Sequence, residues 1–110
     1  MNKERVEEYR KVIEESKVIF LPFTGDTDLL EVSNDKRIIN KYELKRKYPA
    51  YTFITREFKI DNTEGYLLVS KHYLRENIPS LMRAKTSELI ETAENMMGVL
   101  MTKIKKINNN

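Results

Sequence analysis

Two alternating segments that flank a short turn-forming run constrain the fold of this chain more than any other feature. Large or apolar side chains recur at every second position of residues 54–60, and residues 66–74 show the same period of two. Five residues, Asp61 to Gly65, separate the segments, and a polar run that ends in glycine is typical of a hairpin loop. The pattern predicts an antiparallel β-hairpin over residues 51–75, which we expect to form the centre of a sheet.

A run of residues rich in β-formers, 17–23, precedes the hairpin and is continuously apolar from Val18 to Phe23. Such a run predicts a strand that is buried on both faces. Because Pro22 has no backbone N–H group, the strand must end there or lie at an edge of the sheet. The turn-forming residues 24–28 and the short segment 29–32 then predict a return strand and a second hairpin.

Residues 37–48 leave two interpretations open. Their Lys, Glu, Leu and Arg content favours a helix, whereas the spacing of their apolar side chains fits the period of a strand. Capping residues before the segment and Pro49 after it favour the helix slightly.

The N-terminal residues 2–16 show a helical pattern. Val6, Tyr9 and Ile13 recur at helical spacing, and most of the other side chains in this segment are charged. We therefore expect an amphipathic helix with one face packed and the other solvated.

The C-terminal residues 78–107 show a second, much longer helical pattern. Pro79 suits the first turn of a helix, and the apolar residues keep a helical period as far as Ile107. An unbroken helix here would be about 40 Å long, whereas a compact domain of this size has a radius of gyration of about 13 Å. Either the helix breaks near residues 86–87, where Thr86 or Ser87 would cap a second segment, or its far end packs on another molecule.

Together these patterns predict one α+β domain that spans residues 1–110. The chain length, 110 residues, is the usual size for a single hydrophobic core. We expect an N-terminal helix, an antiparallel sheet of three to five strands, and a long C-terminal helix packed on one face of the sheet.

The composition excludes several kinds of chemistry. No cysteine is present, which rules out disulfides, thiolate nucleophiles and zinc sites with sulfur ligands. The three glycines are widely separated, so a glycine-rich phosphate-binding loop is not expected. We assign no metal site and expect no cofactor. The sequence shows neither a secretion signal nor an apolar span of membrane length, which predicts a cytoplasmic protein without membrane contact.

A basic segment is the strongest candidate for a functional surface. Between residues 36 and 47 there are six Lys or Arg side chains and one acid, Glu43, with tyrosines interleaved. Basic side chains neutralise phosphates and tyrosines stack on unpaired bases, so nucleic acid or an acidic protein would suit this surface. The alternative is an ordinary solvated face. The candidate residues are Lys36, Arg37, Lys41, Tyr42, Lys45, Arg46 and Lys47.

A second candidate site contains the only histidine of the chain. The alternating pattern places His72 on the second strand of the hairpin, beside a cross-strand Arg56. With Tyr73, these residues form a candidate small-ligand or enzymatic site on the sheet. The alternative is a half-buried histidine that is satisfied by a neighbour, and no catalytic residue is assigned.

The C-terminal helix is a candidate dimer interface. Methionines, which adapt to varied partners, are frequent there, although a methionine stripe at helical spacing is also typical of a core. Gly98 in the middle of the helix suggests that another backbone approaches it closely. The expected interface residues are Leu89, Ala93, Met97, Leu100, Met101 and Ile104.

We therefore expect a small, non-catalytic binding or regulatory protein that acts by contact with a protein partner. Inhibitors and adaptors carried by phages and other mobile elements often have this profile. One alternative is a nucleic-acid-binding protein that uses the basic segment, and a second is a ligand-binding or enzymatic site on the sheet.

Overall fold

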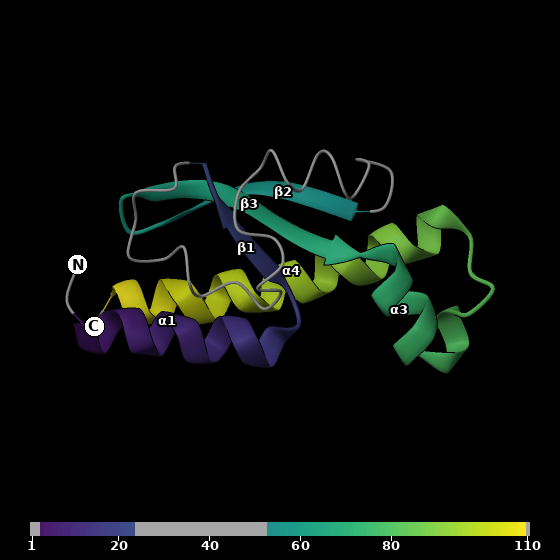
Figure 1. Cartoon of the computed structure of the whole chain (residues 1–110), viewed down its shortest axis with the longest axis horizontal. Coiled ribbons are helices and arrows are strands. Elements are labelled where there is room, and N and C mark those ends of the chain that lie inside the picture. The colour runs from purple at the N-terminus through teal and green to yellow at the C-terminus, as the bar shows by residue number, and fades with distance from the viewer. Residues whose placement is uncertain (1–2, 24–52, 110) are drawn as a thin grey trace.

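The computed structural model describes residues 3–23 and 53–109, and it has the predicted α+β architecture (Figure 1). An N-terminal helix, a three-stranded antiparallel sheet and a long C-terminal helix are all present. In chain order the elements are α1 (Lys3–Ser16), β1 (Ile19–Pro22), β2 (Phe53–Ile60), β3 (Thr63–Ser70), α3 (Lys71–Asn77), the 3₁₀ helix η3 (Pro79–Leu81) and α4 (Thr86–Asn108).

The strand order is β1-β3-β2, and both pairings are antiparallel. The predicted hairpin is confirmed as β2 and β3, and β3 lies at the centre of the sheet. β1 ends at Pro22, as the missing N–H group of proline predicts. The predictions for residues 24–32 and 37–48 lie outside the described residues.

The loop of the hairpin is shorter than the five residues expected. Ile60 pairs with Thr63, so only Asp61 and Asn62 connect the strands, and Gly65 belongs to β3. Asp61 adopts a left-handed backbone with φ of 50°. Asp and Asn tolerate this conformation better than other residues with side chains, so a tight connection forms without glycine.

The second strand of the hairpin ends at Ser70, and the prediction that it continues to residue 75 is wrong. The Ser70 side chain accepts a hydrogen bond from the backbone N–H of Tyr73, at 3.1 Å, and thereby caps α3. Serine is a strongly favoured helix cap. Over the few residues of the first helical turn, the order of polar and apolar side chains also fits the alternation expected of a strand.

The predicted C-terminal helix over residues 78–107 is interrupted, which is the first of the two alternatives expected from the sequence. Pro79 is the first residue of η3, and α4 begins at Thr86. Lys85 is the N-terminal cap of α4 and makes no side-chain capping hydrogen bond, so the predicted capping by Thr86 or Ser87 is wrong. α4 has 23 residues and is therefore about 35 Å long.

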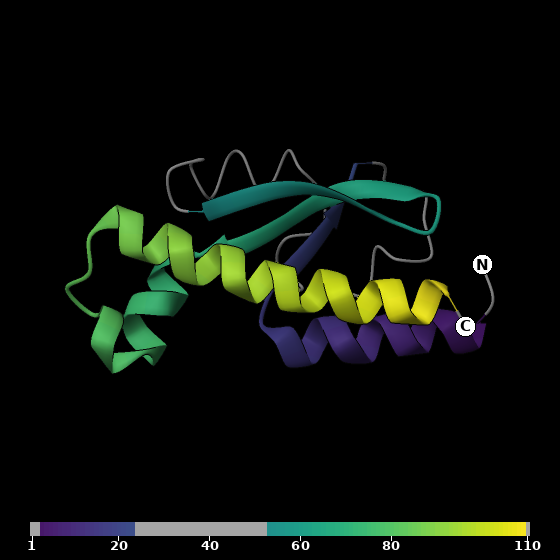
Figure 2. The ribbon, with the colours of Figure 1, turned by 180° about the vertical axis from the view of Figure 1, so that it is seen from behind.

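The main core lies between the sheet and the two long helices. α1 and α4 run antiparallel along one face of the sheet, as Figures 1 and 2 show from opposite sides. We call this the inner face of the sheet. The fully buried side chains of this core come from six elements and include Tyr9, Ile13, Phe20, Ile60, Leu67, Val69, Leu74, Leu89, Ala93, Met97, Leu100 and Ile104.

The opposite, outer face of the sheet carries a smaller apolar cluster. Ile19, Leu21, Phe53 and Leu68 are buried there, and Tyr66 packs against them. β1 is therefore buried on both faces, as its uninterrupted apolar sequence predicts.

Candidate functional site

The predicted basic surface lies outside the described residues. This applies to all seven of its candidates: Lys36, Arg37, Lys41, Tyr42, Lys45, Arg46 and Lys47. Their role as a binding surface stays a prediction from sequence.

The predicted sheet site is spread over two elements. Arg56 lies on β2 opposite Leu67, whereas His72 and Tyr73 lie in the first turn of α3. The expected cross-strand position of His72 beside Arg56 is therefore wrong, because β3 ends at Ser70. Arg56 and His72 are exposed, while Tyr73 is half-buried against the main core.

The stripe predicted as a dimer interface lies in the core of the chain itself. It packs against the inner face of the sheet and α1, which bury it without a second copy. A homodimer stays a prediction, but it gains no support from these residues. Leu89, Ala93, Met97, Leu100 and Ile104 are at most 1% exposed, and Met101 is half-buried against the same core.

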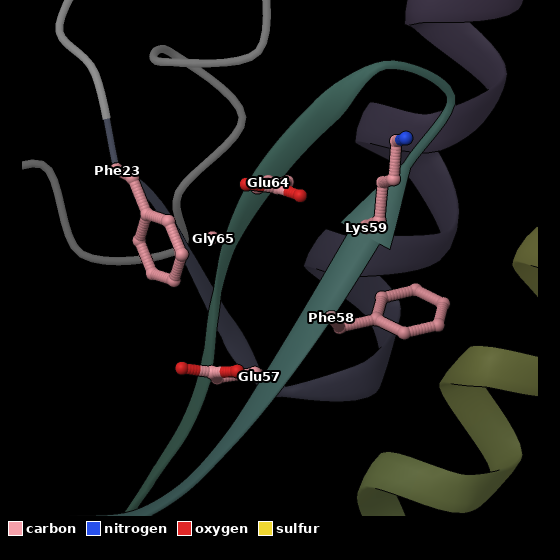
Figure 3. Close-up of a pocket in the computed structure, with 6 residues that line it drawn as sticks. All are labelled: Phe23, Glu57, Phe58, Lys59, Glu64 and Gly65. Carbon is pink, nitrogen blue, oxygen red and sulfur yellow. The ribbon is translucent and has the colours of Figure 1, made fainter.

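A hollow on the outer face of the hairpin is the site that the described residues support best. Its volume is about 240 Å³. It lies towards the tight turn of the hairpin, where β1, β3 and β2 run side by side. The lining residues are Phe23, Glu57, Phe58, Lys59, Glu64 and Gly65 (Figure 3).

Strand register brings these residues together. The backbone N–H of Phe23 donates to the carbonyl oxygen of Glu64 at 2.9 Å, which extends the pairing of β1 with β3 by one residue. Glu57 lies opposite Tyr66, so Glu57 and Glu64 are diagonal neighbours on one face. Such neighbours have backbones about 7–8 Å apart.

The Phe23 ring lines the hollow, and the ring of Tyr66, which is not a lining residue, packs against it. The centroids of Phe23 and Tyr66 are 4.7 Å apart and their planes meet at 66°, an edge-to-face arrangement. Figure 3 shows Glu57 and Glu64 flanking the Phe23 ring, while the ring of Phe58 points to the other side of the strand. The side chains of Glu57 and Glu64 are both exposed. Two negatively charged carboxylates therefore lie next to aromatic rings.

This arrangement suits a cationic side chain. Carboxylates accept charge-assisted hydrogen bonds from guanidinium or ammonium groups, and aromatic rings attract the same groups through their π-electrons. Lys59 also lines the hollow and lies opposite Glu64 in the strand pairing, and Figure 3 shows its side chain extending towards the turn, away from Glu57. A volume of about 240 Å³ is below the roughly 300–1,000 Å³ of pockets that enclose small molecules, so a single long side chain fits better.

Sequence reasoning missed this hollow. Glu57 was expected to face away from the apolar positions of its strand, which is correct, but Glu64 was expected in a loop. The sequence feature that could have predicted it is the pair of acids Glu57 and Glu64, which lie on either side of the turn at positions that face away from the main core. Phe23 could not be added from sequence, because its place depends on the pairing of β1 with β3.

A second polar cluster joins α1, α4 and the turn of the hairpin. The Tyr9 hydroxyl donates to the side-chain oxygen of Asn108, and Arg5 lies 3.9 Å from the Asp61 carboxylate. Burial, with the nearby Asp61 carboxylate, raises the pKa of Tyr9 to about 12. Both effects disfavour the negatively charged tyrosinate. This cluster connects residues far apart in sequence, and we assign it a structural role.

In residues 3–23 and 53–109, no group of three acidic or histidine side chains gathers in a way that would hold a metal ion. None of the helices in these ranges combines the length and the apolar character needed to cross a membrane. No protein-family model, curated protein or solved structure matches the chain in comparisons with known proteins.

Proposed function

We propose that this chain is a non-catalytic binding protein that acts by contact with a partner protein, and that the hollow on the outer sheet face takes up a basic side chain of that partner. The observation that carries the proposal is the position of the Phe23–Tyr66 ring pair beside the Glu57 and Glu64 carboxylates. Anchoring side chains that fill a small pocket commonly dominate protein interfaces, and arginine is one of the most frequent anchors.

Two further features support a protein partner. The hollow adjoins a cluster of buried apolar side chains on the same sheet face, which supports the strands that line it. The floor is formed by paired strands, which fix the backbone positions of Glu57, Glu64 and Tyr66 before binding. Preorganised groups lose little conformational entropy on binding and therefore favour recognition.

The proposal is tested by NMR with the full chain and a pair of probe peptides. One probe is a blocked tripeptide with a central arginine, and the other has citrulline, which has nearly the same shape but no charge. We expect the arginine peptide to shift the backbone amide signals of Glu57, Glu64 and Tyr66, and the citrulline peptide to leave them unchanged.

Charge-neutral variants locate the contact. Glu57→Gln and Glu64→Gln should each weaken binding of the arginine peptide by about 3- to 10-fold, the effect of losing roughly 0.7–1.4 kcal/mol. Glu76→Gln, on the exposed side of α3, is the matched control and should have no effect. Equal responses to both peptides, or equal weakening by all three variants, would contradict the proposal.

A further inference from the structure

The segment that connects β3 to α4 forms a separate surface at one end of the molecule. It comprises residues 71–85, which contain α3, η3 and the connection to Thr86, and we call it the helical arm. In Figures 1 and 2 the arm lies beyond the end of the sheet, at the end of α4 opposite α1. The hollow lies near the start of β3, and the arm begins directly after its end.

The helical arm is firmly built. Leu74 is fully buried in the main core and Leu81 is 8% exposed, so the arm is anchored at two points. Its backbone is closed by hydrogen bonds from the Ile78 N–H to the Leu74 carbonyl and from the Leu81 N–H to the Ile78 carbonyl. The Arg75 guanidinium also donates to the carbonyl of Ala84 at 3.2 Å. The arm therefore presents its outer side chains on a preformed support.

Met82 is the most exposed large hydrophobic residue of the described chain, with 63% of its surface accessible, although its neighbour Leu81 is buried. Methionine and arginine are enriched in protein interfaces, because a flexible apolar side chain and a broad cation adapt to varied surfaces. An exposed methionine on a rigid support therefore provides an apolar contact point.

Cationic side chains outnumber acidic ones on the helical arm. Arg83 follows Met82 directly, Lys85 lies two residues further on, and both are exposed. Lys71 and Arg75 lie on α3, and Glu76 is the single acid of the arm. Such a surface attracts an acidic partner and repels a basic one, which speeds encounter and excludes wrong partners.

We propose that the helical arm docks on an acidic surface of another protein, with Met82 inserted as its apolar centre and Arg83 and Lys85 paired with carboxylates around it. A protein fits better than nucleic acid, because single strands are held by exposed aromatic rings and the tyrosine of the arm, Tyr73, is packed against the core. The partner surface has the opposite charge to the one expected at the hollow, so the chain has two docking surfaces of different specificity.

The probe for this proposal is an acidic pentapeptide with a central leucine, titrated at low salt into the full chain and followed by amide NMR signals. We expect shifts confined to the helical arm and the first turn of α4. The double variant Arg83→Glu/Lys85→Glu should weaken binding by about fivefold or more, since two charge contacts are each reversed. Met82→Ser tests the apolar centre and should weaken binding by about threefold.

Matched controls separate the arm from net charge and from the hollow. Lys11→Glu/Lys103→Glu makes the same charge change at exposed positions of α1 and α4 and should leave binding unchanged. Glu57→Gln should also have no effect, so the two proposals fail independently. Equal weakening by the two double variants would overturn the proposal, because it would show only a response to net charge.

Two further outcomes would also overturn it. Tighter binding of a short oligothymidine through the same residues would assign the arm to nucleic acid. The second is a smaller oligomeric mass of Met82→Glu than of wild type, measured in solution without peptide. It would show that the arm docks on a second copy of the chain. Variants whose circular dichroism differs from wild type are replaced by Arg83→Gln/Lys85→Gln, which keeps the side-chain size and removes the charge.

Discussion

Gly65 and Gly98 place the same residue type in opposite surroundings. A β-carbon added to Gly65 would lie 2.5 Å from the carbonyl oxygen of Leu21 and 2.8 Å from the ring of Phe20. A β-carbon added to Gly98 would meet nothing within 4 Å. Within the described chain a close approach is found at Gly65 and not at Gly98, and the approach of a second copy to Gly98 stays a prediction. At Gly65 β1 packs closely on β3, whereas the side of α4 at Gly98 is open.

The substitution with the largest expected effect on this comparison is Gly65→Ala. No real β-carbon lies as close to a backbone oxygen as 2.5 Å, so β1 must shift away from β3 and the ring of Phe20 must move. We expect the free energy of unfolding to fall by about 3 kcal/mol, at the upper end of the usual cost of overpacking. Urea denaturation of the variant and wild type measures the change.

A second substitution identifies the atom responsible. Phe20→Leu in the Gly65→Ala background removes the ring contact but keeps the contact with the Leu21 oxygen. After the cost of Phe20→Leu in wild type is subtracted, we expect it to recover only part of the loss, and full recovery would show that the backbone of β1 moves freely.

Tyr9 extends the comparison to the other end of the core, where α1 meets the end of α4. Tyr9→Phe removes the hydroxyl that donates to Asn108, and at neutral pH we expect a loss of about 1 kcal/mol. The pKa of Tyr9 is raised to about 12 in the folded protein, above the value of about 10 expected in the unfolded chain. The stabilisation is therefore complete below pH 10 and is lost as the pH rises through 12.

The stability curves of wild type and Tyr9→Phe should consequently converge above pH 10 and then cross. Thermal or urea unfolding at several pH values between 7 and 12 checks this. A constant difference between the two proteins over this range would mean that the hydroxyl titrates alike in the folded and unfolded states.

Gly98→Ala tests the open side of α4. Alanine has a higher helix propensity than glycine, and no atom of the described chain blocks the added carbon, so we expect a gain of about 1 kcal/mol in unfolding free energy. A loss that depends on protein concentration would instead show that a second copy approaches this face, and it would support the homodimer predicted from sequence. Val99→Ala, at a neighbouring position that is 57% exposed, is the control for changes in surface area.

The two glycines also show how far the sequence predicts this fold. Strong periodicity predicted α1, the hairpin and the C-terminal helix correctly, because many residues of each share one pattern. The end of β3 was wrong because Ser70 suits either a strand or a helix cap, and four further residues do not separate a period of two from one of 3.6. The hollow was missed because it combines residues of three strands, and strand order is not readable from local patterns.

Lys17 provides the smallest test, at a position where glycine would fit but is absent. It follows α1 with a left-handed φ of 62°, and Ser16 closes the connection by accepting a hydrogen bond from the Val18 N–H at 3.0 Å. Residues with a β-carbon are strained in this conformation, so Lys17→Gly should raise the free energy of unfolding by about 0.5 kcal/mol after the added flexibility of the unfolded chain is subtracted.

Lys17→Ala is the matched control, because it removes the same charge and keeps the β-carbon. We expect it to leave stability unchanged within about 0.3 kcal/mol, since surface substitutions rarely exceed 0.5 kcal/mol. If both variants gain equally, charge and not backbone strain governs this position. In that case backbone strain would not favour glycine at any position of the described residues. Close packing would be the one remaining reason for a glycine there, and it holds at Gly65.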